Sequence, residues 1–372
     1  MGENFKKRRV KILGSIYKHS CLFGFFLIAF LFFSIINEGL AQKQLKINLP
    51  PSGRLYHGVY PGPEDLSGEE NLITLKSLEL YEKAVGKKVA WVYFSHEWSQ
   101  GENFPLETVH WIRNHGTIPF IRLMLRYKPQ QNIKERVYTL DKIIQGDFDE
   151  ALRAWAIAAR NYQDPLIVEY GTEVNGEWFP WNAKWYGKKK GAVKFKQAYR
   201  HIIDVMRDEN ANNITWVFHV NNLDLPDMEW NRLEKYYPGN DYIDWIGVSI
   251  YGAQTPMSDE WPSFQEAMDA IYPRLVDLDP DKPIVVTEFG MTSGHPYGNQ
   301  AQWAKESLKN LCQNRWPAVI GFSWWNEAWE NDDDLTHNTN MRVQENAELT
   351  QIFQKYIGEN DQVLDELILE NH

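Results

Sequence analysis

Eight short apolar runs recur along the chain, and a longer stretch with helical periodicity separates each from the next. The runs are Leu55–Tyr60, Val89–Ser95, Ile118–Leu125, Leu166–Tyr170, Ile214–His219, Ile243–Ser249, Ile284–Glu288 and Val319–Trp324. Ile284, Val285 and Val286 illustrate runs that are apolar nearly throughout, which is typical of strands buried on both faces. The intervening stretches carry apolar residues three or four positions apart, as at Phe195 and Tyr199.

This alternation of strand and helix predicts the α/β class and, specifically, a (β/α)8 TIM barrel. An open doubly wound sheet is the competing fold, but no glycine-rich phosphate loop follows the first run. About 330 residues follow Ala41, which suits one barrel with long loops. Since no linker or repeat interrupts them, we expect residues 42–372 to form a single catalytic domain.

The first 41 residues have the order of a secretory signal peptide. Basic residues within 6–18 precede the apolar run Cys21–Ile36, and Gly39 and Ala41 supply small residues before a cut at Gln42. The run of 16 residues is short for a spanning helix, which needs about 20 residues. An uncleaved anchor is the alternative. We therefore expect a secreted or periplasmic protein, with no stable membrane partner once the signal is cleaved.

Composition narrows the choice of partner. The chain has a formal net charge of −11, and removing residues 1–41 leaves 33 Lys and Arg against 48 Asp and Glu, a charge of −15. Such a surface repels nucleic acid and anionic membranes but tolerates a neutral polymer. Only Cys312 remains after cleavage, so no intrachain disulfide forms. The 16 Trp and 18 Tyr exceed what a core requires, and flat aromatic faces stack on sugar rings.

Polar and aromatic residues follow the predicted strands, where a barrel of this kind places its chemistry. They are His57, Ser95–Trp98, Arg122–Arg126, Thr172–Gly176, His219–Asn221, Ser249–Tyr251, Thr287–Gly290 and Ser323–Asn326. Because the carboxyl ends of parallel barrel strands share one face, this set predicts a site on that face.

Glu173 and Glu288 are the candidate catalytic pair within this set. They follow the fourth and seventh predicted strands, so they can face each other across the barrel mouth. Breaking a glycosidic bond needs one carboxyl group to donate a proton and another to attack or to activate water. One such Glu alone is more often a surface or ion-pair residue, but two beside aromatic and amide residues favour catalysis.

Four segments resemble glycoside hydrolase family 26. They are GTEVNGEWFPW (171–181), VSIYG (248–252), VVTEFG (285–290) and FSWWNE (322–327), and the resemblance extends from about residue 54 to residue 357. The family belongs to clan A, the retaining barrel hydrolases, which carry the acid/base on strand four and the nucleophile on strand seven. The resemblance therefore implies that Glu173 is the acid/base and Glu288 the nucleophile.

The resemblance also implies substrate-binding roles. Trp178 matches an aromatic residue that lines the site, and Tyr251 matches a Tyr that hydrogen-bonds the nucleophile. Trp324 or Trp325 matches the Trp that forms the floor of the cleaved-sugar subsite, and Asn221 matches an Asn after strand five. We further expect Trp181 to stack on sugar and His96 to hydrogen-bond it.

One departure from the family's residue pattern bears on which substrate we expect. Characterised family members usually carry His immediately before the acid/base, whereas this chain has Thr172. We expect endo-acting, retaining hydrolysis of β-1,4-mannan by double displacement, with mixed-linkage β-1,3-1,4-glucan or β-xylan as alternatives. The rival class is a carbohydrate-binding barrel that has lost catalysis, but such a protein tends to replace at least one carboxylate.

We expect a monomer without a cofactor or metal. His57, His96 and His219 could converge as metal ligands, but strand-end histidines more often hydrogen-bond substrate or each other. The acidic run Asp332–Asp334 lacks the spacing of a calcium loop.

Overall fold

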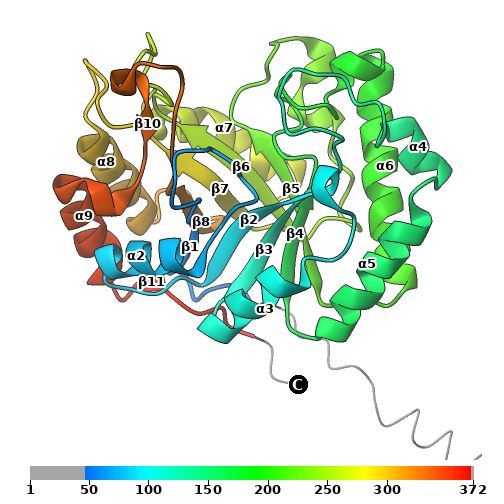
Figure 1. Ribbon diagram of the computed structural model, residues 1–372, viewed down its shortest axis with the longest axis horizontal. Helices are drawn as coiled ribbons and strands as arrows, with labels where there is room; N and C mark the ends of the chain where they lie inside the picture. Colours follow the sequence, from blue (N-terminus) through cyan, green and yellow to red (C-terminus); the bar gives the residue numbers. More distant parts are fainter. Residues whose placement is uncertain (1–46, 370–372) are drawn as a thin grey trace, which may run out of the picture. The chain divides into compact units, whose positions relative to one another are not determined.

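A computed structural model of the chain describes residues 47–369 and shows a closed parallel barrel (Figure 1). Its strands are β1 (Leu55–Tyr60), β2 (Trp91–Glu97), β3 (Ile118–Met124), β4 (Leu166–Tyr170), β5 (Ile214–Asn221), β6 (Trp245–Tyr251), β7 (Ile284–Gly290) and β8 (Val319–Trp325). Each pairs in parallel with the next, and β1 pairs with β8 from Tyr56–Gly321 to Tyr60–Trp325, which closes the ring. The predicted (β/α)8 barrel is confirmed. The predicted signal segment lies outside the described residues.

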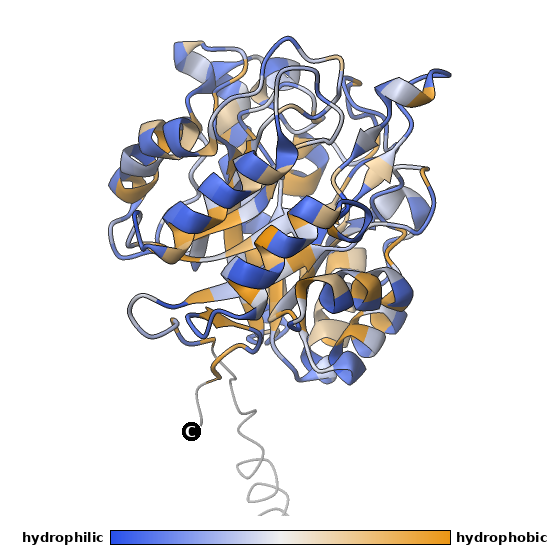
Figure 2. Ribbon diagram, turned by 90° about the vertical axis from the view of Figure 1, so that its left-hand side faces the viewer, coloured by the Kyte–Doolittle hydropathy of each residue, from blue (hydrophilic) through white to orange (hydrophobic). Residues whose placement is uncertain are grey.

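Helices surround this ring. They are α2 (Leu75–Val85), α3 (Leu106–His115), α4 (Leu140–Gln145), α5 (Asp149–Tyr162), α6 (Lys189–Asp208), α7 (Phe264–Leu278), α8 (Gln300–Cys312) and α9 (Ala347–Phe353). In Figure 2 the strands are mainly hydrophobic and the outward faces of the helices mainly hydrophilic. Helix α5, for example, buries Leu152, Trp155, Ala156 and Ala159 at helical spacing. No helix within residues 47–369 is long and apolar enough to cross a membrane.

The interior of the barrel is filled rather than hollow. The indole of Trp91 occupies space left by two glycines: a Cβ on Gly58 would lie 2.0 Å from Trp91 Nε1, and one on Gly321 would lie 2.5 Å from the ring. The Trp91 N–H donates to Ser323 Oγ at 2.7 Å. This packing closes the amino-terminal half of the barrel and leaves the opposite end for the site.

The two ends of the described domain meet at the start of β1. Strand β11 (Val363–Leu364) pairs in parallel with Leu55 and Tyr56, and Ile47 forms an antiparallel bridge with Leu369. The chain therefore enters and leaves the domain beside the amino-terminal ends of the strands.

Several strands extend beyond their predicted carboxyl ends. The ladder between β5 and β6 continues to the pair Asn221–Ser249, and that between β6 and β7 continues to Tyr251–Gly290. Polar residues suggest a loop at these positions, but their backbones still pair with neighbouring strands. As a result, several candidate site residues lie on rigid strands.

Candidate active site

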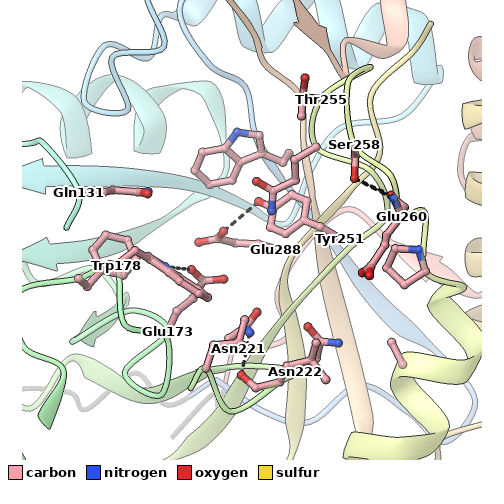
Figure 3. A pocket seen from close by; sticks show the side chains of 18 of the residues that line it. Gln131, Glu173, Trp178, Asn221, Asn222, Tyr251, Thr255, Ser258, Glu260 and Glu288 are labelled. Atoms are coloured by element: carbon pink, nitrogen blue, oxygen red, sulfur yellow. Dashed lines mark hydrogen bonds between the residues drawn. The ribbon is translucent and has the colours of Figure 1, made fainter. Parts of the chain in front are cut away.

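A pocket of about 1090 Å³ opens where the barrel strands end (Figure 3). Residues of several strand ends and their following loops line it, including Glu70, Arg122, Glu173, Trp178, Asn221, Tyr251, Glu288, Trp325, Glu327 and Trp329. Glu173, in the turn after β4, and Glu288, on β7, both point into this pocket.

Glu173 is held by an unusual backbone turn after β4. Gly171 has φ +76° and Glu173 itself has φ +49°, a left-handed conformation that few non-glycine residues adopt. The backbone N–H of Gly176 donates to the Glu173 carbonyl at 2.7 Å and closes the turn. The Trp178 indole N–H donates to Glu173 Oε2 at 2.8 Å. The carboxyl group therefore has a fixed position and direction.

The surroundings of Glu173 favour its protonated form. Burial, and secondly the negative charge of Glu288, raise the pKa of Glu173 to about 7. His219 and the hydrogen bond from Trp178 oppose this rise without cancelling it. Near neutral pH a substantial fraction of Glu173 therefore carries a proton, which is the state that a general acid needs.

Glu288, in contrast, is surrounded by donors and positive charge. Tyr251 Oη donates to Glu288 Oε2 at 2.9 Å. The Tyr93 hydroxyl lies 3.1 Å from Glu288 Oε1 and 2.7 Å from Glu169 Oε1, so its single proton serves both carboxylates. Arg122 Nε lies 3.5 Å from Glu288 Oε1. These groups stabilise a negatively charged Glu288.

A buried ion pair lies beneath the two carboxylates. His219 Nδ1 lies 2.9 Å from Glu169 Oε2, and both side chains are fully buried. Burial alone would raise the pKa of Glu169 and lower that of His219, but their mutual attraction reverses both directions. His219 Nε2 also lies 2.7 Å from the hydroxyls of Ser249 and Thr287. This network joins β4, β5, β6 and β7, including the residue that precedes Glu288.

Thr172 belongs to the same network. Its hydroxyl donates to Glu169 Oε1, and the residue is 1% exposed. Thr172 is not among the residues that line the pocket. The position where the family usually has His is thus used here to hold Glu169.

The structure separates the two adjacent tryptophans of β8. Trp325 lines the pocket, and its ring stacks on Tyr60 with centroids 3.8 Å apart. Trp324 is fully buried, donates from Nε1 to the Met341 carbonyl at 2.7 Å and packs against Phe289. Successive strand residues face opposite sides, so only one of the pair could reach the pocket. Of the two rings, Trp325 is therefore the one that lines the pocket.

Trp178, Tyr251 and Asn221 line the pocket as predicted, but Trp181 and His96 do not. The Trp181 N–H donates to the Thr172 carbonyl at 2.8 Å, so this ring supports the segment that carries Glu173. His96 is buried beside Trp155 of α5, whose indole N–H approaches His96 Nδ1 at 3.4 Å. Direct sugar contact by either residue stays a prediction.

The three histidines considered as metal ligands have separate partners. His57 Nε2 lies 2.7 Å from the Tyr81 hydroxyl, whereas His96 and His219 contact Trp155 and Glu169. Within residues 47–369 no group of three or more His, Cys, Asp or Glu side chains is arranged to hold a metal ion.

Glu70 and Glu327 are among the pocket residues that were not singled out from the sequence. Glu70, in the loop after β1, lies 2.8 Å from Arg122 Nη1, and it belongs to no motif that would mark it. Glu327 ends the quoted segment FSWWNE, but its polar character alone did not distinguish it from a loop residue. Charged residues inside apolar strands, such as Arg122 in β3 and Glu169 in β4, were the visible signal of this buried network.

Comparison with known proteins identifies the family. The family described as glycosyl hydrolase family 26 matches residues 133–332, more than half of the chain. The chain belongs to glycosyl hydrolase family 26. The matched region contains Glu173, Tyr251 and Glu288, whereas Glu70 and Arg122 precede it.

Relatives of this family 26 chain are named for several different activities. The chain is 26% identical to endoglucanase H of Acetivibrio thermocellus over 260 residues. This aligned region covers 69% of this chain and 27% of that protein. It is 28% identical over 169 residues to a mannan endo-1,4-beta-mannosidase of Bacillus subtilis strain 168, covering 44% of this chain and 40% of that protein. A beta-1,3-xylanase of a Vibrio species is 24% identical over 129 residues, covering 34% and 25%. The chain thus matches between a quarter and two fifths of the length of these relatives.

Solved structures of family 26 share the fold. The β-mannanase BoMan26A of Bacteroides ovatus superimposes with a TM-score of 0.59 at 16% identity, covering 84% of this chain and 90% of that chain. A Bacillus subtilis mannanase superimposes with a TM-score of 0.55 at 17% identity, covering 82% and 86%.

Proposed function

We propose that this chain is a secreted, retaining endo-β-glycosidase that hydrolyses a β-linked polysaccharide, with β-1,4-mannan as the first candidate. The observation that carries the proposal is the contrast between two carboxyl groups of one pocket. Glu173 has a pKa raised to about 7 by burial and by Glu288, whereas Glu288 accepts hydrogen bonds from Tyr251 and Tyr93. A carboxyl group that retains its proton beside one that accepts hydrogen bonds is the pairing that a double displacement requires.

In this mechanism Glu288 attacks the anomeric carbon while Glu173 gives its proton to the departing glycosidic oxygen. A covalent glycosyl ester forms on Glu288, and Glu173 is left as a carboxylate. Glu173 then removes a proton from water, which attacks the anomeric carbon and releases Glu288. Tyr251 and Tyr93 stabilise Glu288 as a carboxylate before the attack and again after its release.

Mannan is supported by the mannan endo-1,4-beta-mannosidases among the relatives. A glucan is the second candidate, because endoglucanase H aligns over a larger share of this chain than those mannanases do. The use of Thr172 to hold Glu169, at a position where the family usually has His, also supports a substrate other than mannan.

A substrate screen tests the activity. Purified protein is incubated with β-mannan, mixed-linkage β-glucan and β-1,3-xylan, and reducing ends and viscosity are followed together. We expect reducing ends from one polymer, with a rapid fall in viscosity because internal bonds are cut. Tight binding to a polymer without any release of reducing ends would instead establish the carbohydrate-binding barrel.

The roles of the two carboxylates predict opposite stereochemistry in azide rescue. Glu288→Ala should abolish turnover, and added azide should restore it with an inverted product, because azide replaces the nucleophile. Glu173→Ala should retain activity on aryl glycosides with good leaving groups, and azide should yield a product of retained configuration. Proton NMR of the first-formed anomer is the measurement. The reverse pattern would exchange the two roles, and full activity in both variants would place the site elsewhere.

A further inference from the structure

A third buried carboxyl group lines the pocket beyond the catalytic pair. Glu327 follows β8 and is 2% exposed. Its Oε2 accepts a hydrogen bond from the Trp325 indole N–H at 2.9 Å. Its Oε1 is buried and has no hydrogen-bond partner among the described residues. Buried polar atoms nearly always have a hydrogen-bond partner, so this atom calls for a functional explanation.

The position of Glu327 is fixed on two sides. On one side, the hydrogen bond joins it to Trp325, whose ring stacks on Tyr60 of the neighbouring strand β1. On the other, a Cβ on Gly62 would lie 3.1 Å from the Glu327 Cβ, so the loop after β1 packs directly against the side chain. The Tyr60 hydroxyl, also buried, likewise has no hydrogen-bond partner within residues 47–369.

The charges around Glu327 determine its protonation state. Burial, and secondly the negative charge of Glu70, raise the pKa of Glu327 to about 8. Arg342 and Arg122 oppose this rise, but Arg122 is already paired with Glu70 at 2.8 Å, and Arg342 with Glu345 at 3.1 Å. At pH 7 Glu327 is therefore mostly a neutral carboxylic acid. Because Oε2 accepts from Trp325, the free oxygen Oε1 is the one placed to carry the proton and donate it.

We propose that Glu327 is a specificity-determining residue whose Oε1 donates a hydrogen bond to a hydroxyl of the neutral sugar ring bound against Trp325. This inference rests on the proposed glycosidase function and assigns one hydrogen bond within its substrate site. A neutral acid suits an uncharged sugar, because it donates without placing a further negative charge beside Glu70. Discrimination follows because a sugar without a hydroxyl at that point leaves Oε1 unpaired.

Binding measured without hydrolysis tests the inference. In a Glu173→Gln background, β-1,4-mannohexaose is titrated by calorimetry, or the mixed-linkage glucan or β-1,3-xylan oligosaccharide if that polymer is the one cleaved. Adding Glu327→Ala should weaken binding about ten- to a hundredfold, the range expected for losing a hydrogen bond to a buried group. Adding Glu327→Gln, which keeps an acceptor for Trp325 and a neutral donor, should change affinity by less than about threefold at pH 7. Glu79→Gln, exposed on α2 and outside the pocket lining, is the matched control and should leave affinity unchanged.

A pH series separates sugar contact from a merely structural role. With Glu327 present, affinity should fall as pH rises through about 8, because the donor proton is lost; in the Glu327→Gln variant the fall should be absent. Identical pH profiles for Glu327 and its Gln variant would overturn the inference, even if the Ala variant fails to fold. If the Glu173→Gln parent binds none of the three oligosaccharides, the proposed function fails instead.

Discussion

Glu173 combines a strained backbone with a buried charge. Its left-handed conformation, φ +49°, is unfavourable by roughly 1–2 kcal/mol for a residue with a Cβ. Its carboxyl group is also desolvated and lies near Glu288. Both features reduce stability while positioning a proton donor, which is the kind of compromise found at catalytic residues.

Glu173→Gln should therefore stabilise the folded protein in a pH-dependent way. Since folding raises the pKa of Glu173 from 4.5 to about 7, the stability that the neutral carboxyl contributes is present below pH 4.5 and is lost as pH rises to about 7. The variant should gain on the order of 2–3 kcal/mol over wild type at pH 8 and little at pH 4. Chemical denaturation at the two pH values measures this. Glu177→Gln, on the same loop but paired with Lys184 at the surface, should show no such gain; an equal gain there would refute the explanation.

Trp178→Phe should shift the pH dependence of catalysis, because it removes the indole N–H while keeping an aromatic ring at this position. The Trp178 N–H lowers the pKa of Glu173, so its loss should raise that pKa further. The alkaline limb of the kcat profile, where the general acid loses its proton, should then move to higher pH. Trp185→Phe is the control, because the Trp185 N–H donates to the Phe179 carbonyl instead. A shift to lower pH, or none, would contradict the assigned hydrogen bond.

At the scale of elements, the strands were predictable because each is apolar and buried on both faces. The carboxyl ends of the strands were not predictable, because Asn221 and Tyr251 are polar yet remain in the sheet. The choice between Trp324 and Trp325 needed the strand register, which fixes the face that each ring occupies. Glu70 could not be found at all, since a loop carries no periodicity that would place it beside Arg122.

The direction of the Trp181 side chain could not be predicted for a related reason. Trp181 shares a motif with Glu173, and its indole N–H donates to the backbone carbonyl of Thr172. Proximity in sequence indicated the neighbourhood of Trp181 but not the hydrogen bond that fixes its ring.

The turn between β4 and Glu173 predicts a sensitive glycine. A Cβ on Gly171 would lie 2.3 Å from the Phe195 ring of α6, whereas one on Gly187 would meet only Lys190 Cβ at 3.9 Å. Both glycines have left-handed φ angles, +76° and +82°, so Ala strains the backbone at either. Gly171→Ala should destabilise the protein by about 2–3 kcal/mol more than Gly187→Ala, in line with overpacking, and should reduce kcat severely. Equal melting temperatures and rates for the two variants would exclude the contact with Phe195 as the cause.

At the scale of the whole molecule, the chain is acidic and so is its pocket. The net charge is −11, and Glu70, Glu173, Glu288 and Glu327 are grouped around the single guanidinium of Arg122 among the residues that line the pocket. The negative charge of the pocket is reduced by the protons that Glu173 and Glu327 hold, as well as by Arg122. We therefore expect the pocket to accept uncharged sugars more readily than uronic acids.

The meeting of both domain ends at the start of β1 has a practical consequence for orientation. Because Ile47 and Leu369 lie beside the amino-terminal ends of the strands, a protein tethered there directs its pocket away from the support. Immobilisation through a carboxyl-terminal biotin tag should therefore preserve kcat/KM on polymer within about twofold.

Attachment through a cysteine introduced at Leu335 should block activity on polymer but spare small aryl glycosides. Leu335 is 74% exposed in the loop between β9 (Ala328–Trp329) and β10 (Thr339–Asn340). The native Cys312 should not compete for a maleimide at pH 7, because burial raises the pKa of its thiol to about 11. Comparing the two supports on insoluble and soluble substrate measures the effect, and equal loss of polymer activity would refute it. A domain attached to a support through these ends would present its pocket on the side away from the support, where it can reach an insoluble polymer.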